Sequence, residues 1–360
     1  MLGNLPALSV VSYLCLVIQL FSGSTASSNA SMFAEALSLS PSSSGTNSNG
    51  NIDHTRPTVL VTGSTDGIGV TTAKNLLSKG YNVLIHGRSE HRIQHAKRTV
   101  QAFVDHHSND PGTPITLPAV DISTVNGCEQ LVEHVKSTRE QHKLQLSVIM
   151  NNAGVFSEDH VVTSDGLELT FAVNVMAPFV ITSHLLPLLL PSSSGGDSGS
   201  TTSSSTAAGS RRIVIASSIS QSRSIRNWDD MEYSQRTYSA HSAYSESKLL
   251  DAMLTMEFAS RLKKNGYDTD QVTCNCLDPG TVNTKMLLAG WGRCGIDVND
   301  ALDETWLCSS NEVDSVTGKY FVWQSERTAS SDTYNEAERT KMWNMLSRIA
   351  PKAAEMWNFK

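Results

Sequence analysis

The chain has 360 residues, of which 39% are hydrophobic and 18% are charged, an ordinary composition for a globular protein with a sizeable core. Its formal net charge at pH 7 is -7, and the basic residues do not gather in one stretch. Nucleic acid binding needs a clustered basic surface, so the sequence excludes a general affinity for DNA or RNA.

The N-terminal segment differs from the rest in composition. Residues 7–21, ALSVVSYLCLVIQLF, form an apolar run of signal-peptide length, and the small residues 23–26 that follow suit a cleavage site. We expect a signal peptide over residues 1–26, with an uncleaved signal anchor as the alternative, since a membrane span needs about 20 apolar residues. Residues 27–56 are rich in Ser and Asn and are expected to form a disordered tether.

These two segments bear on the cellular compartment. A signal would direct the chain to the secretory pathway or the endoplasmic reticulum, and the apolar segment would provide membrane association. A signal followed by a Ser-rich, acid-poor extension also resembles the bipartite plastid presequences of algae with complex plastids. A plastid is therefore the alternative location.

The cysteines do not suggest a disulfide framework. Beyond Cys15 in the apolar run there are five, an odd and sparse set: Cys128, Cys274, Cys276, Cys294 and Cys308. Cys274 and Cys276 lie two apart in an expected strand, where parallel Cβ vectors make poor disulfide geometry, so we interpret them as small buried core residues. No metal site is expected.

From residue 57 the sequence alternates short β-branched runs with longer amphipathic runs. Strands are expected over 58–63, 82–87, 115–120, 146–152, 212–218, 272–277 and 319–323, and helices over 68–80, 90–106, 123–141, 166–190 and 241–264. This alternation predicts a Rossmann-type doubly wound parallel sheet, a three-layer α/β/α single domain over 57–345, with a C-terminal tail over 346–360. The Ser- and Gly-rich segment 192–210 is expected to be a disordered insertion without catalytic importance.

The first expected strand runs into a glycine-rich turn, TGSTDGIG, at residues 62–69. Such a turn lets backbone amides approach a pyrophosphate at a helix N-terminus. The spacing of its glycines resembles that of the classical short-chain dehydrogenase/reductases. The residues expected to bind a dinucleotide here are Gly63, Ser64, Thr65, Asp66, Gly67, Ile68 and Gly69.

The second expected strand ends beside Arg88 rather than beside an acidic residue. A carboxylate near this point would favour the ribose hydroxyls of NAD, whereas an arginine suits the 2′-phosphate of NADP. The sequence therefore predicts NADP(H) in preference to NAD(H). An arginine that merely stacks on the adenine ring is the alternative.

Two further strand ends match the same family. The resemblance implies that Asp121 and Ile122 contact the adenine, although Asp121 could equally cap the next helix. It also implies that the motif NNAG, at residues 151–154, shapes the backbone beside the cofactor through Asn151, Ala153 and Gly154.

Four residues are candidates for catalysis. Tyr244 and Lys248 are four apart in an expected helix and share one face, so the ammonium can lower the pKa of the phenol. Ser218 ends the fifth expected strand, where a hydroxyl can bond both a substrate carbonyl and the phenol. Asn174 is a poor residue for a helix interior. The resemblance makes it the holder of a water in a proton relay to the lysine; otherwise it caps an irregular turn.

The sixth expected strand is followed by LDPGTVNTKM, at residues 277–286. In the family pattern this turn meets the nicotinamide carboxamide, through Pro279, Gly280, Val282 and Thr284, with Tyr244 and Lys248 also contacting the cofactor. The apolar stretch that follows, with glycines as hinges, reads as a lid over the substrate. Met286, Leu287, Leu288 and Trp291 suggest an apolar substrate, with core packing as the rival interpretation.

The resemblance covers residues 57–345 and is strongest to the retinol-dehydrogenase-like or WW-domain-oxidoreductase-like group. It implies an NADP(H)-dependent oxidoreductase that interconverts a carbonyl and an alcohol on a small, apolar substrate of retinoid, steroid or aldehyde type. A light-dependent protochlorophyllide-type reductase is one alternative, and a non-catalytic NADP-binding regulatory protein is another. The sequence leaves homodimer formation open.

Overall fold

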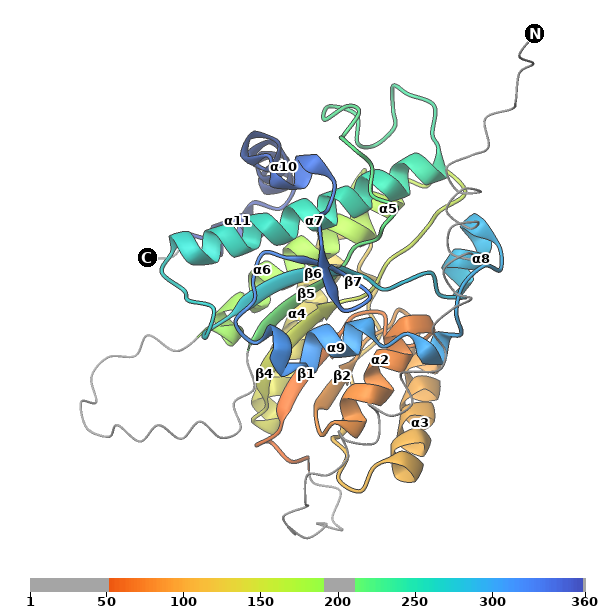
Figure 1. The fold of residues 1–360 in the computed structure, drawn as a ribbon, viewed down its shortest axis with the longest axis vertical. Coiled ribbons are helices and arrows are strands. Elements are labelled where there is room, and N and C mark those ends of the chain that lie inside the picture. Colours follow the sequence, from red (N-terminus) through yellow and green to blue (C-terminus); the bar gives the residue numbers. More distant parts are fainter. Residues whose placement is uncertain (1–51, 191–210, 359–360) are drawn as a thin grey trace. The chain divides into compact units, whose positions relative to one another are not determined.

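The computed structural model describes residues 52–190 and 211–358 (Figure 1). The expected signal segment, most of the tether and the 192–210 insertion lie outside these residues. The last residues of the expected tether belong to the domain instead. Arg56 forms ion pairs with Asp53 and Asp110, and its guanidinium donates to the carbonyl of Gly80 at 3.3 Å.

Eight strands form one sheet in the order β3-β2-β1-β4-β5-β6-β7-β8. They are β1 (Pro57–Val61), β2 (Asn82–Ile85), β3 (Pro114–Thr116), β4 (Gln145–Asn151), β5 (Arg212–Ala216), β6 (Thr273–Asp278), β7 (Tyr320–Val322) and β8 (Ser325–Arg327). All neighbours are parallel except β7 and β8. This confirms the predicted doubly wound sheet; the antiparallel edge strand was not predicted.

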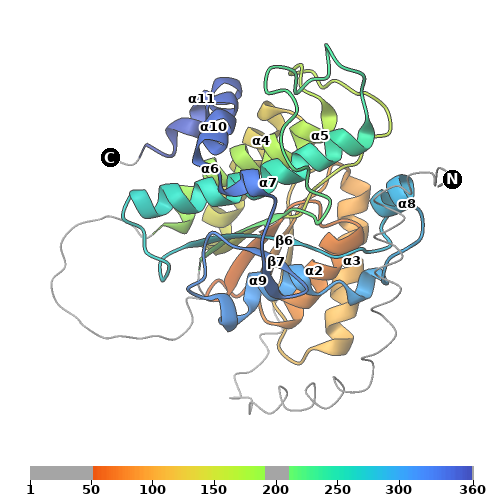
Figure 2. The same ribbon diagram turned by 45° about the horizontal axis from the view of Figure 1, so that its top comes forward.

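Helices cover both faces of the sheet (Figures 1 and 2). One face carries α2 (Gly67–Ser78), α3 (Glu90–His107) and α9 (Asp303–Ser309), and the other carries α4 (Val125–His142), α6 (Ala177–Leu189) and α7 (Ala240–Lys264). Side chains alternate along each strand. Val59 and Val61 of β1 therefore pack on the side of α2, α3 and α9, while Leu60 packs on the side of α4, α6 and α7. The three-layer prediction is confirmed.

The chain departs from the predicted elements where local chemistry opposes them. The expected strand at 115–120 ends at Thr116, two residues before Pro118, which has no amide hydrogen to donate to a ladder. The expected helix at 166–190 begins as α5 (Leu169–Phe171), widens into a π-helical turn, η1 (Ala172–Met176), and then continues as α6. A short helix that was not predicted, α8 (Lys285–Trp291), follows β6.

The C-terminal residues are part of the domain. A tail was predicted from residue 346, whereas α10 (Glu336–Ile349) and α11 (Pro351–Glu355) pack against α7 and α6. Leu346 is fully buried, and the ring of Trp357 stacks on Phe258 at 4.4 Å while its indole N–H donates to Ser183 at 2.8 Å. The described part of the chain also contains the 3-10 turns η2 (Val298–Asp300), η3 (Asn311–Val313) and η4 (Ser331–Tyr334).

Three further features lie outside the cleft: the cysteines, possible metal ligands and one long apolar helix. Within 52–190 and 211–358 the five cysteines are free thiols, and Cys274 and Cys276 are fully buried, which confirms their prediction as small core residues. In the same ranges no group of three or more His, Cys, Asp or Glu side chains could hold a metal ion. One described helical stretch, Leu169–Leu189, is long and apolar enough to cross a membrane, but 83% of its apolar 18-residue window is buried in the domain core.

Candidate active site

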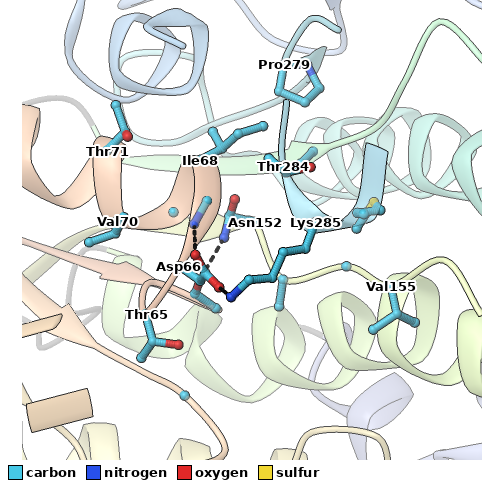
Figure 3. A pocket seen from close by; sticks show the side chains of 18 of the residues that line it. Thr65, Asp66, Ile68, Val70, Thr71, Asn152, Val155, Pro279, Thr284 and Lys285 are labelled. Atoms are coloured by element: carbon cyan, nitrogen blue, oxygen red, sulfur yellow. Dashed lines mark hydrogen bonds and ion pairs between the residues drawn. The ribbon is translucent and has the colours of Figure 1, made fainter. Parts of the chain in front are cut away.

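A cleft of about 600 Å³ opens at the carboxyl ends of the central strands, where the strand order reverses at β1 and β4 (Figure 3). Open sheets of this kind bind ligands at that reversal. The predicted residues that line the cleft are Gly63, Thr65, Asp66, Gly67, Ile68, Gly69, Arg88, Asp121, Ile122, Ala153, Gly154, Tyr244, Lys248, Pro279 and Thr284. Segments distant in sequence thus meet in one cavity.

The glycine-rich turn needs its glycines for two different reasons. Gly63 and Gly67 have φ angles of +66° and +56°, which residues with a Cβ rarely adopt. At Gly69 a Cβ would lie 2.6 Å from the carbonyl oxygen of Gly63 and 2.5 Å from the side-chain nitrogen of Asn152. Asp66 caps α2 by accepting from the amide of Gly67 at 2.9 Å. The positive end of α2 therefore faces the cleft.

Some of the predicted cofactor residues do not line the cleft but are buried next to it. Ser64 is buried, and its hydroxyl accepts from the amide of His86 at 3.0 Å. The amide of Asn151 donates to the Thr182 hydroxyl at 3.0 Å, inside the core. The neighbouring Asn152 lines the cleft instead and donates to the carbonyl of Thr62 at 2.6 Å. Asn152, Ala153 and Gly154 of the motif thus line the cleft, whereas the Asn151 side chain lies behind it in the core.

The segment after β6 is braced in a similar way. Val282 is buried and forms an isolated bridge with Ile296, while the amide of Gly280 donates to Asp278 at 3.1 Å. Pro279 and Thr284, at the two sides of this turn, line the cleft.

His86 was not predicted to have a role, yet it ties three strand ends together. Its Nδ1 accepts from the amide of Gly63 at 3.1 Å, so the proton lies on Nε2, 3.2 Å from the carbonyl oxygen of Val120. Burial lowers its pKa to about 4, so the imidazole is neutral at physiological pH.

Basic side chains collect at the far end of the cleft from Tyr244, beside β2. Arg88, Arg92 and Lys74 all line this part. Arg92 was missed by the sequence analysis, although its position four residues after Arg88, near the start of α3, is a usable signal. Asp121 does not cap α4, whose N-cap is Thr124; its carboxylate accepts from the amide of Ser123 at 3.0 Å.

Tyr244 and Lys248 line the other end of the cleft, and the remaining two predicted catalytic residues, Ser218 and Asn174, lie close to them without lining it. The Nζ of Lys248 lies 5.6 Å from the ring centroid of Tyr244, and the Ser218 hydroxyl lies near enough to the phenol to favour its ionised form. The neighbouring Ser217 is not free for this task, because its hydroxyl donates to the backbone carbonyl of Lys248 at 2.7 Å. Ser217 rather than Ser218 lines the cleft, however, so the choice between the two serines stays a prediction.

The electrostatics of the phenol differ from the simple expectation. Burial raises the pKa of Tyr244 above its ordinary value, while the charge of Lys248 and the nearby Ser218 hydroxyl act in the opposite direction. The predicted lowering by the lysine is present, but desolvation in the protein alone outweighs it. A further positive charge in the cleft would be needed for a net lowering.

Asn174 lies in the π-helical turn η1, where its side chain forms hydrogen bonds with two other segments. Its side chain accepts from the amide of Val155 at 2.8 Å and donates to the carbonyl of the same residue at 3.1 Å. It also donates to the hydroxyl of Ser247 at 2.9 Å, and Ser247 in turn donates to the carbonyl of Tyr244 at 2.7 Å. Asn174 thus joins three segments at the active end of the cleft.

The residues between Tyr244 and Lys248 had no predicted roles, and each has one in the structure. Ser245 accepts at its carbonyl from the amide of Ser222, and Ser247 links Asn174 to the helix. Glu246 receives both terminal nitrogens of Arg236, at 3.0 and 2.8 Å. These contacts fasten the polar loop between β5 and α7 to the helix that carries Tyr244.

Aromatic rings surround the outer side of Tyr244. Ring centroids of Phe156 and Trp291 lie 5.8 and 5.4 Å from that of Tyr244, and His241 lies 5.1 Å from both Phe156 and Trp291. Trp291 was predicted as a substrate-side residue; Phe156 and His241 were not, although His241 lies three residues before Tyr244 on the same helix face. These rings form an apolar wall beside the phenol.

Helix α8 lies over the cleft as the predicted lid would. None of its residues is buried, which disfavours the core-packing interpretation, and Met286 and Leu288 line the cleft. Figure 3 shows Lys285 reaching from the start of α8 to an ion pair with Asp66 in the glycine-rich turn. The lid therefore touches both ends of the site, through Lys285 at one end and Trp291 at the other.

Glu304 is a lining residue that the sequence analysis did not find. It is only 1% exposed, one of its oxygens accepts from the hydroxyl of Thr72 at 2.8 Å, and the other has no hydrogen-bond partner among the described residues. Burial raises its pKa to about 7. No local pattern marks Glu304, because its position depends on how α9 packs against α2.

The fold and the cleft together define a class of protein, the Rossmann-type oxidoreductases. Comparison with known proteins narrows this class. Residues 57–217 match the short chain dehydrogenase family. The chain is 30% identical to human polyprenol dehydrogenase over 297 residues, covering 79% of this chain and 82% of the relative. It is 28% identical to human retinol dehydrogenase 14 over 309 residues, covering 80% and 84%.

Solved structures agree on the fold. A short chain dehydrogenase from Shigella flexneri, complexed with NADP, superposes with a TM-score of 0.53 at 21% identity, covering 76% of this chain and 98% of that one. The chain belongs to the short chain dehydrogenase family, and within it to the retinol-dehydrogenase-like group, as the sequence analysis predicted.

Proposed function

We propose that the protein is an NADP(H)-dependent oxidoreductase that interconverts a carbonyl and an alcohol on a small, apolar substrate. The observation that carries this proposal is the position of Tyr244 and Lys248 at one end of the cleft, with Ser218 and Asn174 beside them. A phenol, an ammonium and a hydroxyl grouped in this way are suited to moving a proton to or from a substrate oxygen. Groups with that chemistry are of little use to a protein that only binds a nucleotide.

The other end of the cleft fits a dinucleotide. The turn around Gly63, Gly67 and Gly69 has no room for side chains at its closest approach, so its backbone and the N-terminus of α2 are open to a pyrophosphate. When bound there, the cofactor would supply or accept a hydride. Its nicotinamide would face the segment from Pro279 to Thr284.

The protein's own groups would then handle the oxygen and its proton. Tyr244 would donate the proton to a carbonyl oxygen during reduction and remove it from the alcohol during oxidation. Ser218 would hold the same oxygen through its hydroxyl. Lys248 would favour the phenolate by its charge and bind the cofactor ribose, and Asn174 would connect the lysine side of the cluster to water.

The preference for NADP(H) rests on charge at the β2 end of the cleft. Arg88, Arg92 and Lys74 together offer three positive groups to a 2′-phosphate. The double variant Arg88→Ala/Arg92→Ala should lose at least 10-fold in NADPH affinity and little in NADH affinity. Arg98→Ala, an exposed position further along α3, is the matched control. Equal losses for both cofactors would refute the preference.

The substrate class rests on the wall of rings and apolar side chains beside Tyr244. Phe156 and Trp291 flank the phenol, and Met286 and Leu288 extend the apolar lining. The names of the two human relatives, polyprenol and retinol dehydrogenase, agree with an apolar alcohol or aldehyde. Retinoids, steroids and fatty aldehydes are therefore the substrates to test first.

The test is a panel of retinals, steroid ketones, fatty aldehydes and quinones, with consumption of NADPH and of NADH followed in parallel. We expect turnover with at least one apolar carbonyl and with NADPH in preference to NADH. Tyr244→Phe should abolish this turnover, because the phenyl ring has no proton to exchange. NADPH binding by that variant, measured by fluorescence, should stay within about threefold of the wild type, and full activity would refute the proposal.

A further inference from the structure

Two acceptors bind the ammonium of Lys248. It donates to the carbonyl of Ala216 at 2.8 Å and to a carboxylate oxygen of Asp251 at 2.9 Å. An ammonium has three donors, so one remains. Gly154, which lines the cleft, lies on the open side, where a Cβ would be 3.8 Å from Nζ. Lys248 is therefore anchored on two sides and presents its third side to the cleft.

Among the described residues, the Asp251 carboxylate has Lys248 as its one hydrogen-bond partner. It lies one turn beyond Lys248 on α7 and is completely buried. One carboxylate oxygen receives Lys248, and the other has no hydrogen-bond partner among the described residues. Burial raises the pKa of Asp251 to about 6 against the opposing pull of Lys248, so it is ionised at neutral pH and above. An ionised, buried Asp251 offsets part of the charge that Lys248 presents to Tyr244.

Other titratable groups face this pair from neighbouring elements. Asp278 and Cys276 come from β6 and Glu304 comes from α9, whereas Tyr320 of β7 interacts with Asp278, Cys276 and Tyr244 rather than with the pair itself. Asp278 accepts from the amides of Ile219 and Gly280, and Glu304 accepts from Thr72, so neither bonds the lysine in the described structure. Asp251 is thus the acid that contacts Lys248 directly.

We propose that Asp251 is a positioning residue that anchors Lys248 and offsets part of its charge, and thereby sets the pH at which Tyr244 works. The inference rests on the proposed function, in which Tyr244 exchanges the proton. Asp251 is not one of the four predicted catalytic residues, and this proposal gives its buried carboxylate a role.

The size of the effect follows from the geometry. The two contacts of Lys248 place the Asp251 oxygen no more than about 8.5 Å from the Tyr244 ring centroid, where a unit charge shifts a pKa by roughly one unit at an effective dielectric constant of about 20. Neutralising Asp251 should therefore move the ionisation of the coupled phenol and lysine to lower pH by about one unit. The direction is the same whichever of the two releases the proton.

The experiment is the pH profile of alcohol oxidation with NADP, in which the rate rises as Tyr244 loses its proton. Asp251→Asn should move the midpoint down by about one pH unit, and Asp251→Glu should restore it toward the wild-type value. Glu257→Gln, which removes an acid from the same helix two turns away, is the matched control and should leave the midpoint unchanged. An unchanged or raised midpoint in Asp251→Asn would overturn the proposal.

Two additions keep the result decisive. Asp251→Ser is made alongside Asp251→Asn, because either neutral side chain can accept a hydrogen bond from Lys248. If only one of the two variants folds, that variant is sufficient to measure the shift. The phenol is also titrated without substrate by ultraviolet difference spectroscopy against Tyr244→Phe, which should show the same downward shift. If Tyr244→Phe is active, the proposed function fails; if it is inactive but the Asp251 variants keep the wild-type midpoint, only the present inference fails.

Discussion

Replacing Asn174 by Ala should cost both stability and activity, and the structure sets the size of the loss. Asn174 is 1% exposed and its amide makes three hydrogen bonds, two to Val155 and one to Ser247. Each buried hydrogen bond contributes about 1 kcal/mol net, so the variant should lose about 3 kcal/mol of unfolding free energy. For a domain of this size that corresponds to a fall in Tm of roughly 6 °C.

The assay is thermal and urea denaturation followed by circular dichroism, with turnover measured at a temperature where both proteins are folded. Asn126→Ala, an exposed position on α4, is the matched control and should change stability by less than about 0.5 kcal/mol. The turnover of Asn174→Ala should fall at least 10-fold, since Ser247 and the carbonyl of Tyr244 lose their link to η1. A stability loss below about 1 kcal/mol would show that the three bonds do not hold the π-helical turn.

Two further predictions address the cleft. Gly69→Ala should reduce NADPH affinity at least 10-fold, because its Cβ would lie 2.6 Å from a backbone oxygen, whereas at Gly154 a Cβ would meet only ordinary contacts at 3.5 Å and beyond, so Gly154→Ala should fold normally. Isothermal titration of both variants decides this, and equal affinities would contradict it. Glu304 has a pKa raised from 4.5 to about 7, so the folded state holds its proton more tightly and the protein should lose stability as pH rises from about 4.5 to 7. Glu304→Gln should flatten this slope in urea denaturation series, by on the order of 3 kcal/mol across the window, and an unchanged slope would refute the assignment.

The alternation of strands and helices was predictable because each element depends on the local spacing of its apolar residues. Strands buried on both faces read as continuous apolar runs, and β1, β4 and β5 were each found within two residues of their observed ends. The motifs at their carboxyl ends were found for the same reason, since parallel strands bring these ends to one edge of the sheet. Thr65 and Pro279, far apart in sequence, line one cleft in consequence.

Other parts of the site depend on packing that no local pattern records. In the π-helical turn, Asn174 forms hydrogen bonds with Val155 and Ser247, and both belong to other segments. Glu304 and Phe156 reach the site through α9 and the loop after β4. The net rise in the pKa of Tyr244 follows from burial, which the helical spacing to Lys248 cannot express.

The C-terminal helices illustrate a related limit. Residues 346–358 were predicted to be a tail although seven of the thirteen are apolar, and Leu346 and Trp357 close the core over α6 and α7. Trp357 stacks on Phe258 and anchors this segment, a contact that depends on tertiary packing rather than on a local pattern.

The central claim is that Tyr244 exchanges a proton with an oxygen whose carbon receives a hydride from NADPH. It is tested most directly with NADPH carrying deuterium at the transferred position and the best apolar carbonyl from the panel, with mass spectrometry of the alcohol product. The account predicts deuterium on the carbinol carbon with the wild-type protein and no labelled alcohol with Tyr244→Phe, although that variant still binds NADPH. Labelled alcohol from Tyr244→Phe at the wild-type rate, or no labelled product from the folded wild type with any carbonyl of the panel, would contradict it.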